Sequence, residues 1–202
     1  MRSSCSRFKP ACVITLSLIA VGTLWFAFLR PRPATIPTVT LPPAPEVALT
    51  NLTLRNDRLY PRDDTNAFSG SMVEHYPDGV LKSRSSVRQG RLEGPSEGWY
   101  TNGVLQVREH FVDGVSHGTR TKWFPDGSKA SEAAITNGQV VGIFRRWRED
   151  GSLAEEIAMD RDKPHGLSRS FYPSGAIQTE ARLEHGQLID RKSWNDGENL
   201  PK

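Results

Sequence analysis

A 24-residue period constrains this chain more than any other feature of its sequence. Units of this length begin at residues 70, 94, 118, 142 and 166, and a shortened copy begins at residue 190. Residues 118–141 read GTRTKWFPDGSKASEAAITNGQVV, and a shift of one unit in either direction meets the same pattern. A fixed period in this range indicates a repeat architecture, in which each unit packs mainly against its neighbours.

Each unit contains two turn signals that depend on glycine. The first is the Pro-Asp-Gly triplet at 125–127, and the second is the Asn-Gly pair at 137–138, with Asp162 replacing glycine in the fourth unit. Such sequences between short apolar segments favour hairpins, because glycine accepts a positive φ without a clash at Cβ. We therefore expect a structural role for the glycines of the first turn, which are Gly79, Gly103, Gly127, Gly151 and Gly175.

The segments between the turns are predicted to be strands. One ends in an aromatic pair such as Trp123-Phe124, which is typical of a half-buried strand. Residues 129–135 and 153–159 are rich in alanine and glutamate, which form strands poorly, and only their register with the other units favours a strand. The sequence thus predicts an all-β fold, an elongated single-layer antiparallel meander of hairpins that grows by about 10 Å per unit.

The repeat resembles the MORN repeat, and more closely the variant MORN family that includes YwqK-type proteins described as antitoxins. The resemblance rests on the Tyr-Pro-Asp-Gly run at 76–79, the Trp-Tyr-Thr-Asn-Gly run at 99–103, the leucine after each run, the second turn and the glycine that opens the next unit. It covers residues 58–198, and residues 199–202 form a short tail. The resemblance implies a scaffold without invariant chemistry, and it adds neutralisation of a toxin as a candidate role.

Two aromatic columns are the main candidate binding residues. We expect them to line opposite faces of the sheet, because successive residues of a strand alternate in direction, with Arg148 interrupting the second column. Packing is the default role in a thin sheet, and an exposed row would be a binding face, since aromatic residues are favoured at interface hot spots. The residues are Trp99, Trp123, Trp147 and Phe171 in the first column, and Tyr100, Phe124 and Tyr172 in the second.

The N-terminal region is predicted to anchor the chain in a membrane. Residues 1–10 are basic, residues 11–29 carry no charge, and residues 30–57 are a proline-rich linker that favours an extended spacer. The uncharged run can cross a bilayer as a helix, and the basic head predicts that the repeats lie on the extracytoplasmic side. The alternative is a secreted protein, because small side chains at 20–22 are suitable for cleavage of a signal peptide.

Charge argues against nucleic-acid binding. The chain has 26 Lys and Arg, four of them in the first thirty residues, so the remainder has 22 basic against 23 acidic residues and a net charge of −1. Binding to nucleic acid needs clustered positive charge. A local basic patch is formed by Arg145, Arg146 and Arg148 together with Arg120 and Lys122. Its simplest interpretation is a solvated strand face, and the alternative is a site for an acidic partner or phosphate.

The residues form no pattern that indicates an enzyme, a metal site or a cofactor site. His117 and His165 occupy the same repeat position two units apart, which is about 20 Å and too far to share one ion. The repeats lack cysteine, and the chain has no nucleophile motif or phosphate-binding loop. We therefore expect neither catalysis nor a cofactor.

These observations together predict a membrane-anchored, non-enzymatic repeat protein. Its expected role is a protein-interaction or scaffold module for an unknown protein partner, with antitoxin-like binding as the narrower form that the resemblance implies. The alternative is binding of lipid or of a cell-envelope polymer by the aromatic face. Open sheet edges also predict edge-to-edge self-association.

Overall fold

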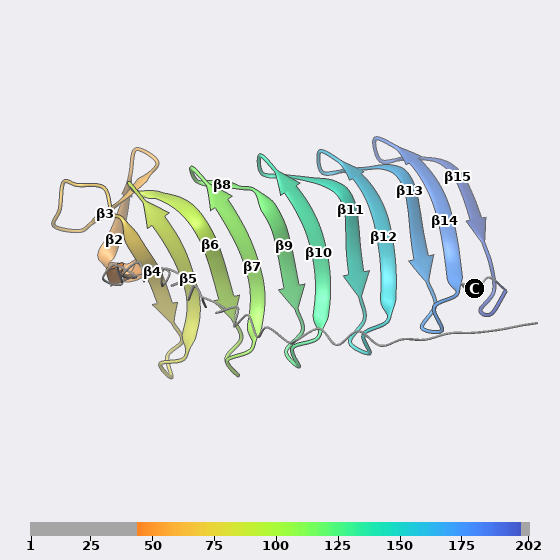
Figure 1. The fold of residues 1–202 in the computed structure, drawn as a ribbon, viewed down its shortest axis with the longest axis horizontal. Helices are drawn as coiled ribbons and strands as arrows, with labels where there is room; N and C mark the ends of the chain where they lie inside the picture. The colour runs from red at the N-terminus through yellow and green to blue at the C-terminus, as the bar shows by residue number, and fades with distance from the viewer. Residues whose placement is uncertain (1–43, 199–202) are drawn as a thin grey trace, which may run out of the picture. The chain divides into compact units, whose positions relative to one another are not determined.

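The computed structural model describes residues 44–198, which form a long, mainly antiparallel β-sheet (Figure 1). The predicted membrane helix at 11–29, the basic head and the tail at 199–202 lie outside the described residues. Within residues 44–198 no helix is long and apolar enough to cross a bilayer.

The main sheet has thirteen described strands, and from β4 onward they follow one another in chain order (Figure 1). Each pair of neighbours is antiparallel except β1 and β4, which are parallel, and β8 is a short addition that pairs with β7. The strands are β1 (Glu46–Ala48), β4 (Gly70–His75), β5 (Leu81–Arg88), β6 (Arg91–Trp99), β7 (Leu105–Val112), β8 (Val115–Ser116), β9 (Gly118–Trp123), β10 (Lys129–Thr136), β11 (Gln139–Trp147), β12 (Leu153–Asp160), β13 (Lys163–Phe171), β14 (Ile177–Glu184) and β15 (Gln187–Ser193).

The two predicted turns are confirmed, and they alternate between the two long edges of the sheet (Figure 1). In the first turn Gly127 has φ 89°, and its N–H donates to the carbonyl of Phe124 over 2.9 Å. In the second turn both residues have positive φ, 51° at Asn137 and 82° at Gly138. Asp162 adopts φ 64° where the other units have glycine, so aspartate accepts this conformation in the fourth unit.

The alanine- and glutamate-rich segments are strands, as their register predicted. They correspond to β10 and β12, and each pairs with a neighbour on both sides. Strand propensity alone would have assigned them poorly, because pairing with two adjacent strands overrides the intrinsic preference of short segments.

The structure differs from the sequence prediction between residues 46 and 57, which were placed in the linker. This stretch contains β1, a 3-10 turn (Leu49–Asn51) and β2 (Leu52–Arg55), and β2 pairs with β3 (Arg58–Pro61) in a separate two-stranded sheet. Asn56 and Asp57 form the hairpin turn with φ 49° and 57°. Proline content indicated a linker, but apolar residues after residue 45 give this segment a surface to bury.

The two-stranded sheet covers the first repeat unit, so the prediction of a single layer is wrong at this end. The buried side chains of Leu52, Phe68 and Val87 pack together, with exposures of 9%, 6% and 5%. Partly buried apolar residues from four strands surround them, namely Val47, Leu59, Met72 and Leu92. We call β2, β3 and Phe68 the cap.

Candidate functional site

The aromatic columns are half-buried, and they connect neighbouring repeat units. None of the seven residues is fully buried or fully exposed. The hydroxyl of Tyr100 donates to the carbonyl of Trp123 over 2.9 Å, and that of Tyr172 donates to the carbonyl of Trp194 over 3.0 Å. Tyr76 makes the equivalent bond in the first unit. Each bond joins one unit to the next, so the second column has a structural role.

Arg148 replaces tyrosine in this series of bonds rather than interrupting it. Its guanidinium donates to the carbonyl of Phe171, the atom that a tyrosine hydroxyl at this position would reach. It also donates to the carbonyl of Leu153 over 3.0 Å. Phe124 occupies the equivalent position in the third unit and has no hydroxyl to donate. This tyrosine-like contact of an arginine could not be predicted from the repeat pattern.

Cations lie over two tryptophans of the first column. The guanidinium carbon of Arg108 is 5.9 Å from the ring centroid of Trp123, and the ammonium of Lys129 is 5.2 Å from that of Trp147. Both distances are within the range of a cation–π contact. These contacts are internal to the sheet, and a binding role for the aromatic residues stays a prediction.

Charged side chains of alternating sign cross one face of the sheet in a single row. Arg108 pairs with Glu97 at 2.8 Å, Arg145 with Glu156 at 2.7 Å, and Arg169 with Glu180 at 2.9 Å. Opposite charges on facing strand positions stabilise a sheet modestly. The residues in register along this row are Arg84, Glu97, Arg108, Thr121, Glu132, Arg145, Glu156, Arg169, Glu180 and Lys192.

The basic patch noted in the sequence is paired within the sheet. Arg145 contacts Glu156, Arg146 contacts Glu155 at 2.6 Å, and Arg148 donates to backbone carbonyls. Four of the arginine–glutamate pairs in the sheet join residues 11 apart in sequence, a spacing that could have revealed them. A phosphate or an acidic partner would have to compete with these carboxylates.

The most enclosed ion pair lies on the other face, between Glu109 and Arg120. Two hydrogen bonds of 2.5 and 2.9 Å join them, and their side chains are 14% and 33% exposed. Burial raises the pKa of the Glu109 carboxyl, but the hydrogen bond and charge of Arg120 outweigh it, so the pKa lies below its ordinary value. This pair is satisfied internally and offers no free acid or base.

The structure places two histidines from different repeat positions next to each other. The rings of His165 and His185 have centroids 4.7 Å apart, and the backbone N–H of His185 donates to His165. Asp160 lies near both rings. Among the described residues no group of three or more metal-binding side chains is arranged to hold an ion.

An apolar hollow lies where the cap meets the first two repeat units. Its volume is about 520 Å³. Leu54 and Val115 stand at its mouth with 66% and 46% of their surface exposed. Asp57, Arg91 and Asp113 supply the charges around it. The apolar lining consists of Leu49, Leu54, Leu59, Met72, Leu92 and Val115, and we call this hollow the cap pocket.

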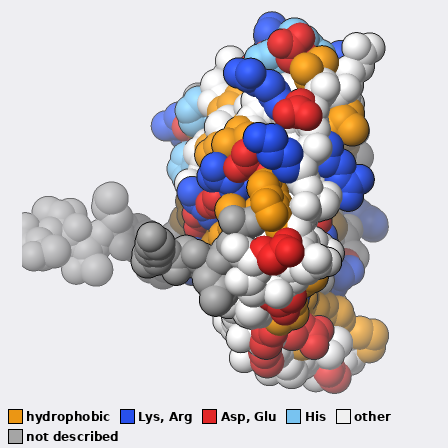
Figure 2. Space-filling view, turned by 90° about the vertical axis from the view of Figure 1, so that its right-hand side faces the viewer, with side chains coloured by type: hydrophobic (Ala, Val, Ile, Leu, Met, Phe, Trp, Pro, Cys, Tyr) orange, Lys and Arg blue, Asp and Glu red, His pale blue; other side chains and the backbone are white. Residues whose placement is uncertain are grey.

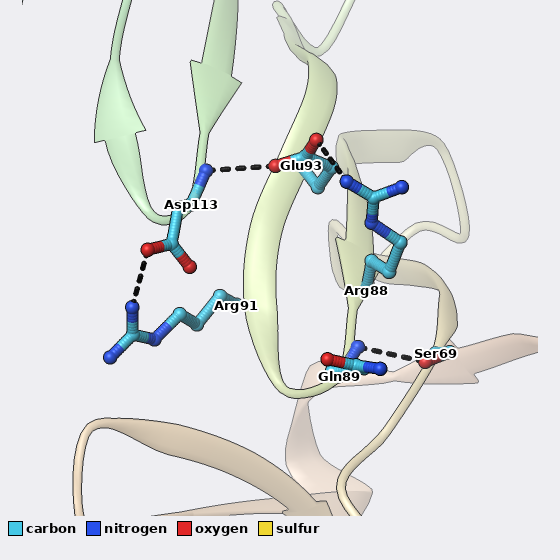
Figure 3. Close-up of polar contacts among 6 residues, drawn as sticks. All are labelled: Ser69, Arg88, Gln89, Arg91, Glu93 and Asp113. Atoms are coloured by element: carbon cyan, nitrogen blue, oxygen red, sulfur yellow. Dashed lines mark hydrogen bonds and ion pairs between the residues drawn. The ribbon is translucent and has the colours of Figure 1, made fainter.

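Polar contacts between successive turns hold the side of the cap pocket in place (Figure 3). The N–H of Asp113 donates to Glu93 over 2.8 Å, and the carboxylate of Asp113 accepts from Arg91 over 2.7 Å. Glu93 also pairs with Arg88 at 2.6 Å. One turn further back, the N–H of Gln89 donates to the hydroxyl of Ser69 over 2.8 Å. These contacts fix the turn that presents Val115.

The cap pocket was not predicted from the sequence, although a signal was present. The residues before and after the second turn are polar in four of the five units, but in the second unit they are Val112 and Val115. Both valines are exposed, at 47% and 46%. A second hollow of about 430 Å³ continues past them toward His117 and Asn137. The cap side of the pocket could not be found because the cap itself was not predicted.

Comparison with known proteins supports the repeat assignment in part. A family model described as the MORN repeat variant matches residues 92–113 and 164–188. MORN repeats are in general modules that interact with proteins or membranes. No curated protein matches the chain. The narrower likeness to antitoxin-like proteins stays a prediction, and the chain is thus similar to the MORN repeat variant family over two stretches of its repeats.

Proposed function

We propose that this protein is a non-enzymatic protein-interaction module, and that its partner docks at the cap pocket. The N-terminal anchor and the extracytoplasmic location of the repeats are part of the proposal. Binding of a toxin is its narrower form. The repeats act as a rigid scaffold, because hydrogen bonds and ion pairs join each unit to the next.

One observation carries the proposal: the second unit exposes valine at both positions where its sister units carry polar residues. Val112 and Val115 are about half-exposed. Val115 lines the cap pocket with its leucines and methionine, and both valines line the second hollow next to it. Exposed apolar surface around a hollow is typical of an interaction site. The polar residues at these positions in the other units show that the hairpin itself does not need valine.

The charges around the cap pocket indicate the chemistry of the partner. Asp57 and Asp113 lie at the pocket with Arg91, and Arg91 is already paired with Asp113. The net charge of the lining is therefore −1. A protein segment with an apolar side chain next to a lysine or arginine would fill the hollow and meet this charge.

The test is affinity capture with the full chain and two variants of the cap pocket, Leu54→Glu and Val115→Glu. Both replacements place a charge on a side chain that is already exposed, so the fold is expected to persist. Ile143→Glu is the matched control, because Ile143 is 42% exposed and lies outside the pocket. We expect a protein that the wild type and the control retain and that both pocket variants lose.

Two outcomes would contradict the proposal. A partner that all three variants retain would place the site elsewhere on the sheet. A partner lost only with Trp99→Ala and Trp123→Ala would restore the aromatic face as the binding surface. Co-sedimentation of the full chain and its residue 1–29 deletion with anionic liposomes or cell-wall material would support the lipid or polymer alternative if it required the same tryptophans.

A further inference from the structure

The two ends of the main sheet differ in how far their outer edges are blocked. β1 is only three residues long, follows Pro45 and pairs in parallel with β4, so it offers a short edge. β15 has seven residues, and all of them are exposed. Among the described residues no strand pairs with the outer edge of β15. Figure 2 shows this end of the sheet, where charged and apolar side chains are mixed.

The register of β15 shows which of its backbone groups point outward. The N–H of Trp194 donates to the carbonyl of Gln178 over 3.1 Å, so these two residues form a hydrogen-bonded pair. Hydrogen-bonded pairs alternate along an antiparallel ladder. Lys192 and Asp190 therefore bond to β14, and the N–H and C=O groups of Arg191 point away from the sheet.

We propose that two copies of this chain pair through β15 as antiparallel strands, with Arg191 of one copy opposite Arg191 of the second. The outward-pointing N–H and C=O groups of one β15 must bond to the outward-pointing groups of the other β15. The possible registers of the two strands therefore differ in steps of two residues. In the proposed register Asp190 of each copy lies opposite Lys192 of the other, which gives two ion pairs. The neighbouring registers oppose Asp190 to Asp190, or Lys192 to Lys192.

The proposed pairing extends the charged row of each copy across the interface. Lys192 lies at the end of that row, next to Glu180. The two Arg191 side chains lie on the other face, where their long stems allow the guanidinium groups to separate into solvent. Because the opposite end of each sheet is blunted by β1 and the cap, pairing stops at two copies and does not continue into a fibre.

A single-cysteine scan tests the register directly. The full chain, with Cys5→Ser and Cys12→Ser, carries one cysteine at a time as Ile189→Cys, Arg191→Cys or Ser193→Cys. At the two-fold position Cα atoms lie about 5.5 Å apart, within reach of a disulfide. At the other two positions the identical residues are offset by four residues, or about 13 Å. We expect a covalent dimer on mild oxidation at 191 and at least tenfold less at 189 and 193.

Charge reversal provides an independent test. Asp190→Lys alone and Lys192→Asp alone create like charges across the interface and should yield monomers in light scattering of the full chain in one detergent. A mixture of the two variants restores both ion pairs and should form heterodimers. Arg191→Pro removes an outward-pointing N–H, which donates to the carboxylate of Asp190 over 2.8 Å within one copy, and should also yield a monomer.

Several results would overturn the proposed pairing. A monomeric wild type at about 100 μM, equal cross-linking at the three cysteine positions, or a mixture of charge variants that stays monomeric would each be sufficient. The dimer does not depend on the cap pocket, so Leu54→Glu should dimerise like the wild type. Failure of either proposal therefore leaves the other one unaffected.

Discussion

The first repeat unit and the later units have the same backbone pattern but bury their side chains differently. In the first unit, residues 70–93, the cap covers one face and Val87 is 5% exposed. In the fourth unit, residues 142–165, the equivalent residue Met159 and Phe144 on the adjacent strand are only half-buried. The cap therefore adds a second apolar layer to the first unit, although stacking on neighbours alone leaves the equivalent residue of the third unit, Ile135, only 2% exposed.

Hydrogen bonds between units also support the array, beginning with that of Tyr76 in the first unit. Tyr100, Arg148 and Tyr172 each donate to a main-chain carbonyl of the next unit. Each hydrogen bond contributes about 1 kcal/mol to stability, much less than a buried aromatic side chain. The capped end should therefore be the most stable part of the described sheet.

The largest expected effect is loss of the cap core. Phe68→Ala should lower the free energy of unfolding by about 4 kcal/mol, because Phe68 is 6% exposed and its removal leaves a cavity. Phe144→Ala should cost about 2 kcal/mol, since a half-buried ring loses less contact. Urea unfolding of both variants measures the difference. Equal losses of unfolding free energy in the two variants would show that Phe68 in the cap contributes no more to stability than the half-buried Phe144.

A pair of glycines sharpens the comparison further. Gly90 and Gly103 both have φ +79°, but a Cβ on Gly90 would lie 2.8 Å from the Cβ of Arg58 and 2.9 Å from the backbone nitrogen of Leu59, whereas a Cβ on Gly103 would meet nothing within 4 Å. Gly103→Ala should cost about 1 kcal/mol from backbone strain alone. Gly90→Ala should cost about 3 kcal/mol, because the cap must also move. The two melting temperatures report this difference, and a smaller loss at Gly90 would contradict contact between cap and turn.

Acid should destabilise the later units through Glu109. The pKa of Glu109 is lowered in the folded protein. Its carboxylate therefore contributes fully to the stability of the fold above the unfolded-state pKa of about 4.3, and this contribution is lost as the pH falls through the lower folded-state pKa. Glu109→Gln should lower the free energy of unfolding by about 1.5 kcal/mol at pH 7, because it leaves Arg120 without its partner. The variant should also lose less stability than the wild type when the pH falls below about 4.5. Glu97→Gln is the control, since its partner Arg108 is 58% exposed. Identical acid profiles for wild type and Glu109→Gln would refute this role.

The smallest expected effect is a gain in stability. Phe124→Tyr places a hydroxyl at the one position of the second aromatic column that lacks a donor, and it should reach the carbonyl of Trp147. The variant should be more stable by about 1 kcal/mol. Tyr100→Phe is the reciprocal change and should lose a similar amount, since its bond to the carbonyl of Trp123 is 2.9 Å. If both variants melted like the wild type, the column would not link the units.

The repeats could be predicted well from the sequence, because the same turn and strand signals recur in every unit. The glycine turns and the register of β10 and β12 could be predicted from the period alone. The cap could not be predicted in this way, because residues 46–61 occur once and have no sister unit for comparison. Their proline-rich neighbours at 31–45 suggested a linker instead.

The candidate site was predicted less well than the fold. The aromatic columns were visible as a pattern, but the bonds of Tyr100 and Arg148 depend on side-chain reach across a repeat boundary. The valines of the cap pocket differ from their sister positions, and a search for such exceptions would have found Val112 and Val115. The pocket itself required the cap, which brings Leu54 beside the second unit.

Amide hydrogen exchange tests the difference between the capped and uncapped units most directly. An uncapped end of a repeat array would fray and exchange faster than its interior. We predict that amides of β5 and β6 exchange more slowly than the equivalent amides of β11 and β12, and that Phe68→Ala removes this difference. Faster exchange in β5 and β6 of the wild type would contradict it.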